Sequence, residues 1–118
     1  MKLSEKQQIF TFNVSMLICK AYEMGLTLTF GEAYRTREQQ LLYVQSGKSQ
    51  TMNSNHLRRL AVDFNVFKEG NLTYKWEDIK PLGDYWEGLH PTNRWGGDWN
   101  KNDIKDGFID TPHFEMNA

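Results

Sequence analysis

A polar loop runs into an apolar stretch at Ser54-Asn55-His56-Leu57-Arg58-Arg59-Leu60-Ala61-Val62-Asp63-Phe64-Asn65-Val66. Residues 60–67 are rich in β-branched and aromatic side chains, which is typical of a strand. His56 and Asp63 stand seven residues apart, at the two ends of this join. We expect the rest of the chain to be organised around this segment and to add further polar groups to these two side chains.

Upstream of this segment the sequence predicts a helix, a strand and a second helix. Ser4-x-x-Gln7 fits a capping box, so we expect it to begin the first helix, whose apolar residues recur every three or four positions. Residues 26–30 alternate between apolar and polar side chains, which predicts a half-buried strand. Thr36-x-x-Gln39 fits a second capping box and predicts a short helix that ends at Ser46-Gly47.

Downstream, residues 68–71 form a turn by composition, and the alternating residues 72–76 predict a short returning strand. Pro81 suits the first turn of a third helix, which two internal glycines should keep short. Two glycines between aromatics at Trp95-Gly96-Gly97-Asp98-Trp99 predict a tight turn with close backbone approach. A last strand is expected from about Pro112. The elements predict an α+β fold in which about three helices flank a small central antiparallel sheet, with the segment that carries His56 and Asp63 at the sheet edge.

Length and charge limit the classes of protein that need to be considered. With 118 residues, we expect a single domain over residues 1–118 and a monomer. The formal net charge of −1 argues against a general nucleic-acid-binding protein, which would normally be basic. The single cysteine, Cys19, excludes an intrachain disulfide, and its place in the apolar pattern of the first helix predicts a buried thiol.

The N-terminal residues are polar and lack the apolar core of a signal peptide. No apolar run approaches the ~20 residues that are needed to cross a bilayer, so we expect no membrane insertion. These two features predict synthesis in a cytoplasm. If the protein acts outside that compartment, another factor must release it.

His56, Asp63 and His113 together offer two nitrogen ligands and one oxygen ligand. Such a set suits Zn²⁺ and leaves a fourth position for water, as in catalytic zinc sites. A structural zinc site would favour cysteines, which this chain cannot supply. On spacing alone, the alternative is that the histidines simply form hydrogen bonds within the fold.

Four motifs resemble those of one family. Ser54–Asp63 resembles the pattern Ser-x-His-x-x-Gly-x-Ala-x-Asp, and Asp110–His113 resembles Glu/Asp-x-x-His. Tyr34–Gln39 resembles the pattern Tyr-Arg-Ser/Thr-x-x-x-Gln, and Trp95–Trp99 resembles a segment of the endolysin branch. The family comprises zinc D,D-dipeptidases, D-alanyl-D-alanine carboxypeptidases and phage L-alanyl-D-glutamate endolysins. Arg59 stands where the family has glycine, and we expect a turn of different conformation there, with Arg58 or Arg59 projecting towards the substrate.

The resemblance implies that His56, Asp63 and His113 bind one zinc ion. It places the catalytic base at Asp110, three residues before the last histidine. Glu115 is the alternative base. It follows His113 by two residues, and residues two apart on a strand point to the same face. If Asp110 is the base, Glu115 is either a partner of a ligand histidine or an edge carboxylate.

Three further residues receive roles from the same resemblance. Arg35 would stabilise the charge on the scissile carbonyl oxygen, since a guanidinium offers parallel donors and stays protonated. The alternative for Arg35 is a salt bridge to Glu32 or Glu38. Ser54 would donate a hydrogen bond to substrate or cap its loop, and Gln39 would bind substrate or cap its helix.

The implied activity is zinc-dependent cleavage of bacterial peptidoglycan stem peptides after release to the cell wall or periplasm. The tryptophan-glycine segment and the small size favour an L-alanyl-D-glutamate endopeptidase of phage-endolysin type, with no separate wall-binding domain. A D-alanyl-D-alanine carboxypeptidase is the close alternative. A non-catalytic zinc module that binds the wall or a protein is the alternative from another class.

Overall fold

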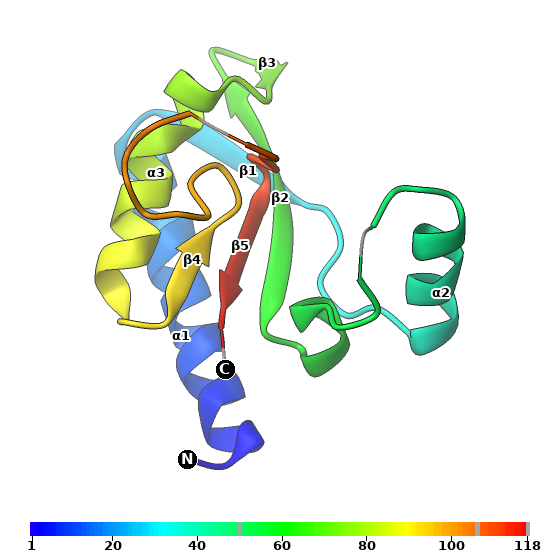
Figure 1. Cartoon of the computed structure of the whole chain (residues 1–118). Coiled ribbons are helices and arrows are strands. Elements are labelled where there is room, and N and C mark those ends of the chain that lie inside the picture. Colours follow the sequence, from blue (N-terminus) through cyan, green and yellow to red (C-terminus); the bar gives the residue numbers. More distant parts are fainter. Residues whose placement is uncertain (50, 106, 118) are drawn as a thin grey trace.

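Figure 1 shows the computed structural model, which describes residues 1–49, 51–105 and 107–117. The helices are α1 (Leu3–Glu23), α2 (Arg37–Gln45), the short 3-10 helix η1 (Asn55–Arg58) and α3 (Trp76–Leu89). The strands are β1 (Leu26–Phe30), β2 (Ala61–Lys68), β3 (Asn71–Thr73), β4 (Asn93–Trp95) and β5 (His113–Met116). Within these ranges, no helix has both the length and the apolar character that a membrane span requires.

The five strands form one antiparallel sheet in the order β1-β2-β5-β4, with β3 paired to β2. The predicted α+β fold with three helices and a small antiparallel sheet is therefore confirmed. β2 is the longest strand, and it lies between β1 and β5 in this order. Asp63 therefore lies on a central strand of the sheet and not at the expected edge. In the register of this pair, Asp63 lies directly opposite His113, and Ala61 lies opposite Glu115.

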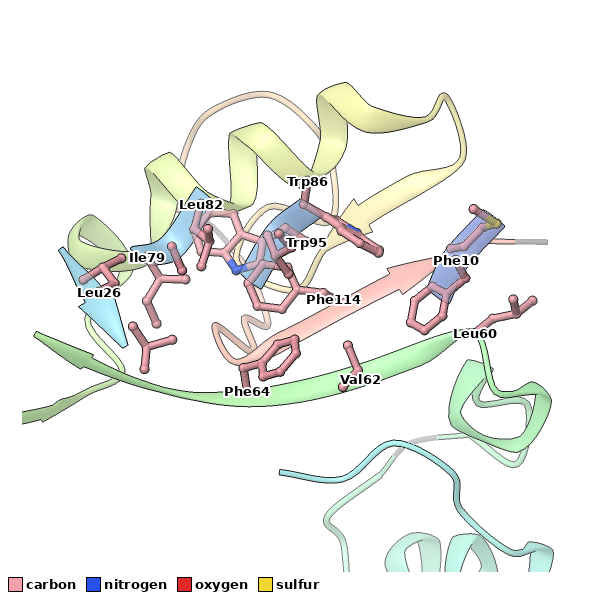
Figure 2. Close-up of a cluster of buried hydrophobic side chains, with 14 residues drawn as sticks. Phe10, Leu26, Leu60, Val62, Phe64, Ile79, Leu82, Trp86, Trp95 and Phe114 are labelled. Carbon is pink, nitrogen blue, oxygen red and sulfur yellow. The ribbon is translucent and has the colours of Figure 1, made fainter. Parts of the chain in front are cut away.

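Alternation along β2 separates a core face from a polar face. Val62, Phe64 and Val66 are buried in the hydrophobic core, whereas Asp63 and Asn65 between them are only half-buried. Side chains two residues apart share a face of a strand, so Asp63 must point away from the core. Figure 2 shows the core side chains of β2 and β5 directed towards the helices.

Helices α1 and α3 cover the core face of the sheet, and α2 lies apart from them beyond β2 (Figure 1). The Phe10 ring of α1 meets the Trp86 ring of α3 edge to face, with centroids 5.5 Å apart. Trp86 is fully buried and also packs edge to face on Phe114 of β5. One aromatic cluster therefore joins both helices to the central strands.

Three local expectations were wrong. Helix α1 begins at Leu3 after Lys2, which makes no side-chain cap, so Ser4 lies inside the helix instead of capping it. Cys19 is exposed because it falls on the face of α1 that points away from the core. Helix α3 begins at Trp76 and not at Pro81, because buried Ile79 extends its apolar face by one turn towards the N-terminus.

The predicted tight turn after Trp95 is confirmed, and it connects β4 to the loop that precedes β5. The Trp95 indole is fully buried and donates to the carbonyl of Thr111 over 2.8 Å. A Cβ atom at Gly96 would collide with the carbonyl oxygen of Asp110, and one at Gly97 would collide with the Trp95 ring. Only glycine lets the backbone approach this closely, so the turn sets the position of the loop before β5.

Two glycines of α3 provide a matched test of this packing. A Cβ at Gly83 would collide with the Trp95 ring, whereas a Cβ at Gly88 meets nothing within 4 Å. We predict that Gly83→Ala lowers the free energy of unfolding by about 1–3 kcal/mol through overpacking. Gly88→Ala should raise it by about 0.4–1 kcal/mol because alanine has less conformational freedom in the unfolded chain. Urea denaturation measures both values, and equal effects of the two substitutions would contradict the packing described.

Candidate metal centre

Three potential metal ligands converge on the polar face of the central strands. Asp63 of β2 and His113 of β5 are direct cross-strand partners, and η1 supplies His56 just before β2 begins. One ligand atom from each side chain can be chosen so that all three lie within 4.8 Å of one another. The three residues that the sequence nominated as ligands are therefore brought together.

The imidazole of His56 is held in one tautomer. Its Nδ1 lies 2.8 Å from the carbonyl oxygen of Ala33, which can only accept, so Nδ1 carries the hydrogen. Nε2 then has a free lone pair; it is buried, has no hydrogen-bond partner and lies 3.5 Å from Asp63 Oδ1. A buried acceptor without a partner is unfavourable, and a cation placed between His56, Asp63 and His113 would satisfy it. The side chains present therefore fit a metal ion.

His113 lies between two carboxylates. Its Nδ1 is 3.0 Å from Asp63 Oδ1, and its Nε2 is 2.8 Å from Glu115 Oε1. Burial of the ring opposes protonation, but the two carboxylates outweigh it and raise the pKa of His113 to about 9. The metal-free protein therefore carries a proton on the edge of His113 that faces Asp63. A metal ion bound at Nδ1 would replace this proton, with Glu115 still holding the opposite nitrogen.

The same ion pairs act on the two carboxylates. Burial opposes the ionisation of Asp63, but His113 and His56 beside it outweigh this effect and lower the pKa of its carboxyl well below the usual range. Burial also opposes the ionisation of Glu115, yet bonding to His113 and Arg94 lowers the pKa of Glu115. Both carboxyl groups therefore remain ionised at neutral pH, as a metal centre requires.

Glu115 has both carboxylate oxygens engaged. Oε1 faces His113, while Oε2 accepts from Arg94 Nε over 3.0 Å and from Arg94 Nη2 over 2.6 Å. Arg94 and Glu115 are register partners on β4 and β5. This arrangement favours a partner of the ligand histidine over the alternative of a catalytic base. Arg94 was not found from the sequence, because only the strand pairing brings it opposite Glu115.

Asp110 lies in the loop that the glycine turn holds in place. Its backbone N–H donates to Gly96 O over 2.7 Å, and its carbonyl accepts from His113 N over 3.1 Å. Asp110 lines the same cavity as His56 and His113. Burial raises the pKa of Asp110, with a further increase from the negative charge of Asp63 and an opposing effect from His113. A raised pKa makes the carboxylate a better proton acceptor, as a general base requires.

Arg35 lies in the wall of the cavity and is mostly buried, with 11% of its side chain exposed. It forms an ion pair with Glu32, one of the two partners considered in its alternative role, and donates to Gln40 Oε1 over 2.6 Å. Its Nη1 also lies 3.4 Å from Ser54 Oγ, which accepts from the backbone N–H of His56. Ser54 therefore caps η1, as one of its two suggested roles requires, and it also lines the cavity.

Gln40 is the glutamine that contacts Arg35, and Gln39 does not line the cavity. The Thr36 side chain caps α2 by accepting from the backbone N–H of Gln39 over 3.1 Å. The Gln40 side chain is fully buried and also donates to Ser49 Oγ over 2.9 Å. The family pattern has three residues between its Ser/Thr and its glutamine. In this sequence that glutamine is Gln40 and not Gln39. Glu32, in contrast, carries no sequence signal for its contact with Arg35.

The expectation of a different turn at Arg59 was wrong. Arg59 adopts the left-handed conformation, with φ 57° and ψ 36°, and ends η1. Its guanidinium stacks on the Tyr34 ring at 4.2 Å from the centroid and does not line the cavity. Arg58 does line it. The turn therefore keeps the backbone shape that suits glycine, although the residue is arginine.

The cavity has a volume of about 940 Å³ and is open on one side to solvent. Its wall includes the candidate ligands His56 and His113 together with Asp110 and Arg35. Trp99 adds an aromatic surface whose ring centroid lies 5.3 Å from that of His113. A volume of this size accommodates several residues of a peptide beside the metal centre.

This chain is similar to known proteins in sequence and in fold. The family model described as phage L-alanyl-D-glutamate peptidase matches residues 6–117. The L-alanyl-D-glutamate peptidase of Listeria phage A118 is 36% identical over 96 residues, which cover 79% of this chain and 31% of that relative. This chain therefore spans about a third of the length of that protein.

Two solved structures have a similar fold. The L-Ala D-Glu endopeptidase ChiX of Serratia marcescens matches with a TM-score of 0.61 at 27% identity, over 78% of this chain and 68% of that one. The vancomycin-resistance D,D-pentapeptidase VanY, solved as a mutant in complex with Zn(II), matches with a TM-score of 0.60 at 19% identity. This second match covers 91% of this chain and 70% of VanY, and it supports the fold alone.

The raised pKa of His113 predicts a pH-dependent stability of the metal-free protein. A group whose pKa is higher in the folded state stabilises the fold below its unfolded pKa and loses this effect as the pH rises through its folded pKa. The free energy of unfolding should therefore fall between about pH 6.5 and pH 9. Urea midpoints measured in a chelating buffer test this expectation. His113→Asn should lack this component, and an unchanged slope in that variant would contradict the assignment.

Proposed function

We propose that this chain, which belongs to the phage L-alanyl-D-glutamate peptidase family, is a zinc-dependent peptidase. Its proposed substrate is the L-alanyl-D-glutamate bond of peptidoglycan stem peptides. The observation that carries the proposal is the free Nε2 of His56, which faces Asp63 and His113 beside a cavity that Asp110 and Arg35 line. The proposed substrate implies action at the bacterial cell wall.

His56 Nε2, Asp63 Oδ1 and His113 Nδ1 are the atoms that would hold the zinc ion. Two nitrogens and one oxygen suit Zn²⁺ and leave an open position, which is typical of catalytic rather than structural zinc. Bound zinc would supply a water of lowered pKa and would polarise the scissile carbonyl. Ala33 and Glu115 hold the two histidines in the tautomers that this geometry needs.

Asp110 is the proposed general base. It would accept a proton from the attacking water and then donate it to the leaving amine. Burial supports this role, because it raises the pKa of Asp110 and so makes its carboxylate a better proton acceptor. The competing candidate, Glu115, has both oxygens occupied by His113 and Arg94. Asp110 has the required access to the cavity.

Arg35 would stabilise the negative charge that develops on the carbonyl oxygen during attack. Glu32 and Gln40 hold its guanidinium in place, so little reorganisation is needed when the charge appears. Ser54, within 3.4 Å of Arg35, could bind an adjacent polar group of the peptide. These contacts support a positioned cation in the cavity wall rather than a mobile surface arginine.

Substitutions at the centre should separate metal binding from proton transfer. Asp110→Asn should lower the rate of peptidoglycan hydrolysis by about 10²–10⁴-fold, because the base is lost, and should still bind zinc. His56→Ala should lose both zinc binding and hydrolysis. Zinc content by elemental analysis and release of soluble peptides measure the two effects. His90→Ala is the matched control, because His90 contacts Thr92 away from the cavity and should change neither quantity.

The products identify the bond that is cleaved. Mass spectrometry of digested muropeptides should show released peptides that begin with D-glutamate, because cleavage of the L-alanyl-D-glutamate bond leaves L-alanine behind. A chelator should abolish this release. Release of terminal D-alanine alone would instead indicate a carboxypeptidase. Tight zinc binding without any product would indicate a non-catalytic zinc module. Either of these two results would overturn the proposed function.

A further inference from the structure

We propose that Arg58, assisted by Lys6, binds the free carboxylate of the glutamate residue in the substrate and so determines specificity for an acidic peptide. This inference rests on the proposed function. A glutamate joined through its amino group and one carboxyl retains a second carboxyl group. If the L-alanyl-D-glutamate bond is cleaved beside the metal centre, this second carboxylate must lie close to the scissile amide.

Arg58 is fixed next to the metal centre. It follows His56 by two residues in η1, and it lines the same cavity. Its Nη1 donates to Asn55 Oδ1 over 3.2 Å, and its Nη2 donates to Asn53 Oδ1. Its carbonyl oxygen accepts from Gln7 Nε2 over 2.7 Å, which joins η1 to the first turns of α1. The position of the guanidinium is therefore set before any ligand arrives.

Charge compensation distinguishes Arg58 from the other two arginines that line the cavity. Arg35 is paired with Glu32, and Arg94 is paired with Glu115. Arg58 contacts only neutral amide oxygens, and within residues 1–49, 51–105 and 107–117 it has no carboxylate partner.

Lys6 of α1 also lines the cavity and likewise has no ion pair in that part of the chain. Its neighbour Gln7 is the residue that bonds the Arg58 carbonyl, so the first turns of α1 and η1 contribute to the same region of the wall. This region carries positive charge without an internal counter-ion, in a protein whose net charge is −1. An anionic group of the ligand would complete it.

The chemistry of arginine suits a carboxylate in this position. A guanidinium has five N–H donors in a planar fork, and the two bonds to asparagine side chains leave others for a ligand. Hydrogen bonds between a guanidinium and a carboxylate are about twice as strong as neutral ones. A carboxamide in place of the carboxylate would lose this charge assistance and would bring its own N–H donors against those of Arg58.

A pair of synthetic stem peptides tests the inference. One peptide contains D-glutamate with a free α-carboxylate, and the other contains D-isoglutamine, which has a carboxamide at that position. The wild-type protein should show a kcat/KM at least about tenfold higher for the carboxylate peptide. Arg58→Gln should remove most of this preference by slowing cleavage of the carboxylate peptide alone. Arg58→Lys should keep part of the preference, and Lys6→Gln should reduce it.

Arg37→Gln is the control, because Arg37 is an exposed arginine of α2 that does not line the cavity, and it should retain the full preference. Zinc content and urea midpoints verify that each variant is folded and loaded. The inference is wrong if the Arg58→Gln variant keeps the wild-type ratio of kcat/KM for the two peptides, whether or not both rates fall. The proposed function stands in that case. If the wild-type protein cleaves neither peptide, the proposed function itself fails.

Discussion

The antiparallel pairing of β2 with β5 is the constraint on which the site depends. It places Asp63 directly opposite His113, and the alternation of each strand sends these two side chains to the face away from the core. The same alternation buries Phe64 and Phe114 on the other face, where their rings pack with centroids 6.3 Å apart. A register shift of one residue would exchange the two faces and lose both the core and the ligands. Stability and chemistry are therefore coupled through one pair of strands.

Burial of charge at the centre is tolerated because each ionised group has a partner. Arg94 bonds Glu115, Glu115 bonds His113, and His113 bonds Asp63, so positive and negative charges alternate along one chain of contacts. Breaking such a chain leaves an uncompensated buried charge, which is strongly destabilising. This series of contacts ends at Asp63, beside the Nε2 atom of His56, which has no hydrogen-bond partner. A cation bound there would contact both groups.

Much of the fold could be predicted because local signals were strong. The alternation of β1 and β2, the Thr36 cap and the glycine turn after Trp95 all depend on near neighbours in the sequence. The start of α3 could not be placed well, since proline predicts a helix start but tertiary packing extended this helix past it. Tertiary context also decides which face of α1 is buried, and this leaves Cys19 exposed.

The candidate metal ligands could be nominated because few residue types can serve, only three histidines are present, and the motifs around them resemble those of a zinc peptidase family. Their supporting residues were harder to identify. Glu32 and Arg94 act through contacts that depend on where a loop and a strand register place them. Ordinary polar side chains of this kind carry no distinctive pattern. Physical inference from sequence therefore reaches the ligands more readily than the groups that orient them.

Arg59 shows how a departure from the family pattern can preserve geometry. The left-handed turn ends η1 and lets the Leu60 N–H bond the carbonyl of Asn55 over 3.0 Å, so that Leu60 enters the core. A residue other than glycine in this conformation costs of order 1 kcal/mol. The stacking of Arg59 on Tyr34 contributes about 0.5–1 kcal/mol in the opposite direction. The two terms nearly cancel, and so arginine can occupy the turn without displacing His56 from the candidate metal centre.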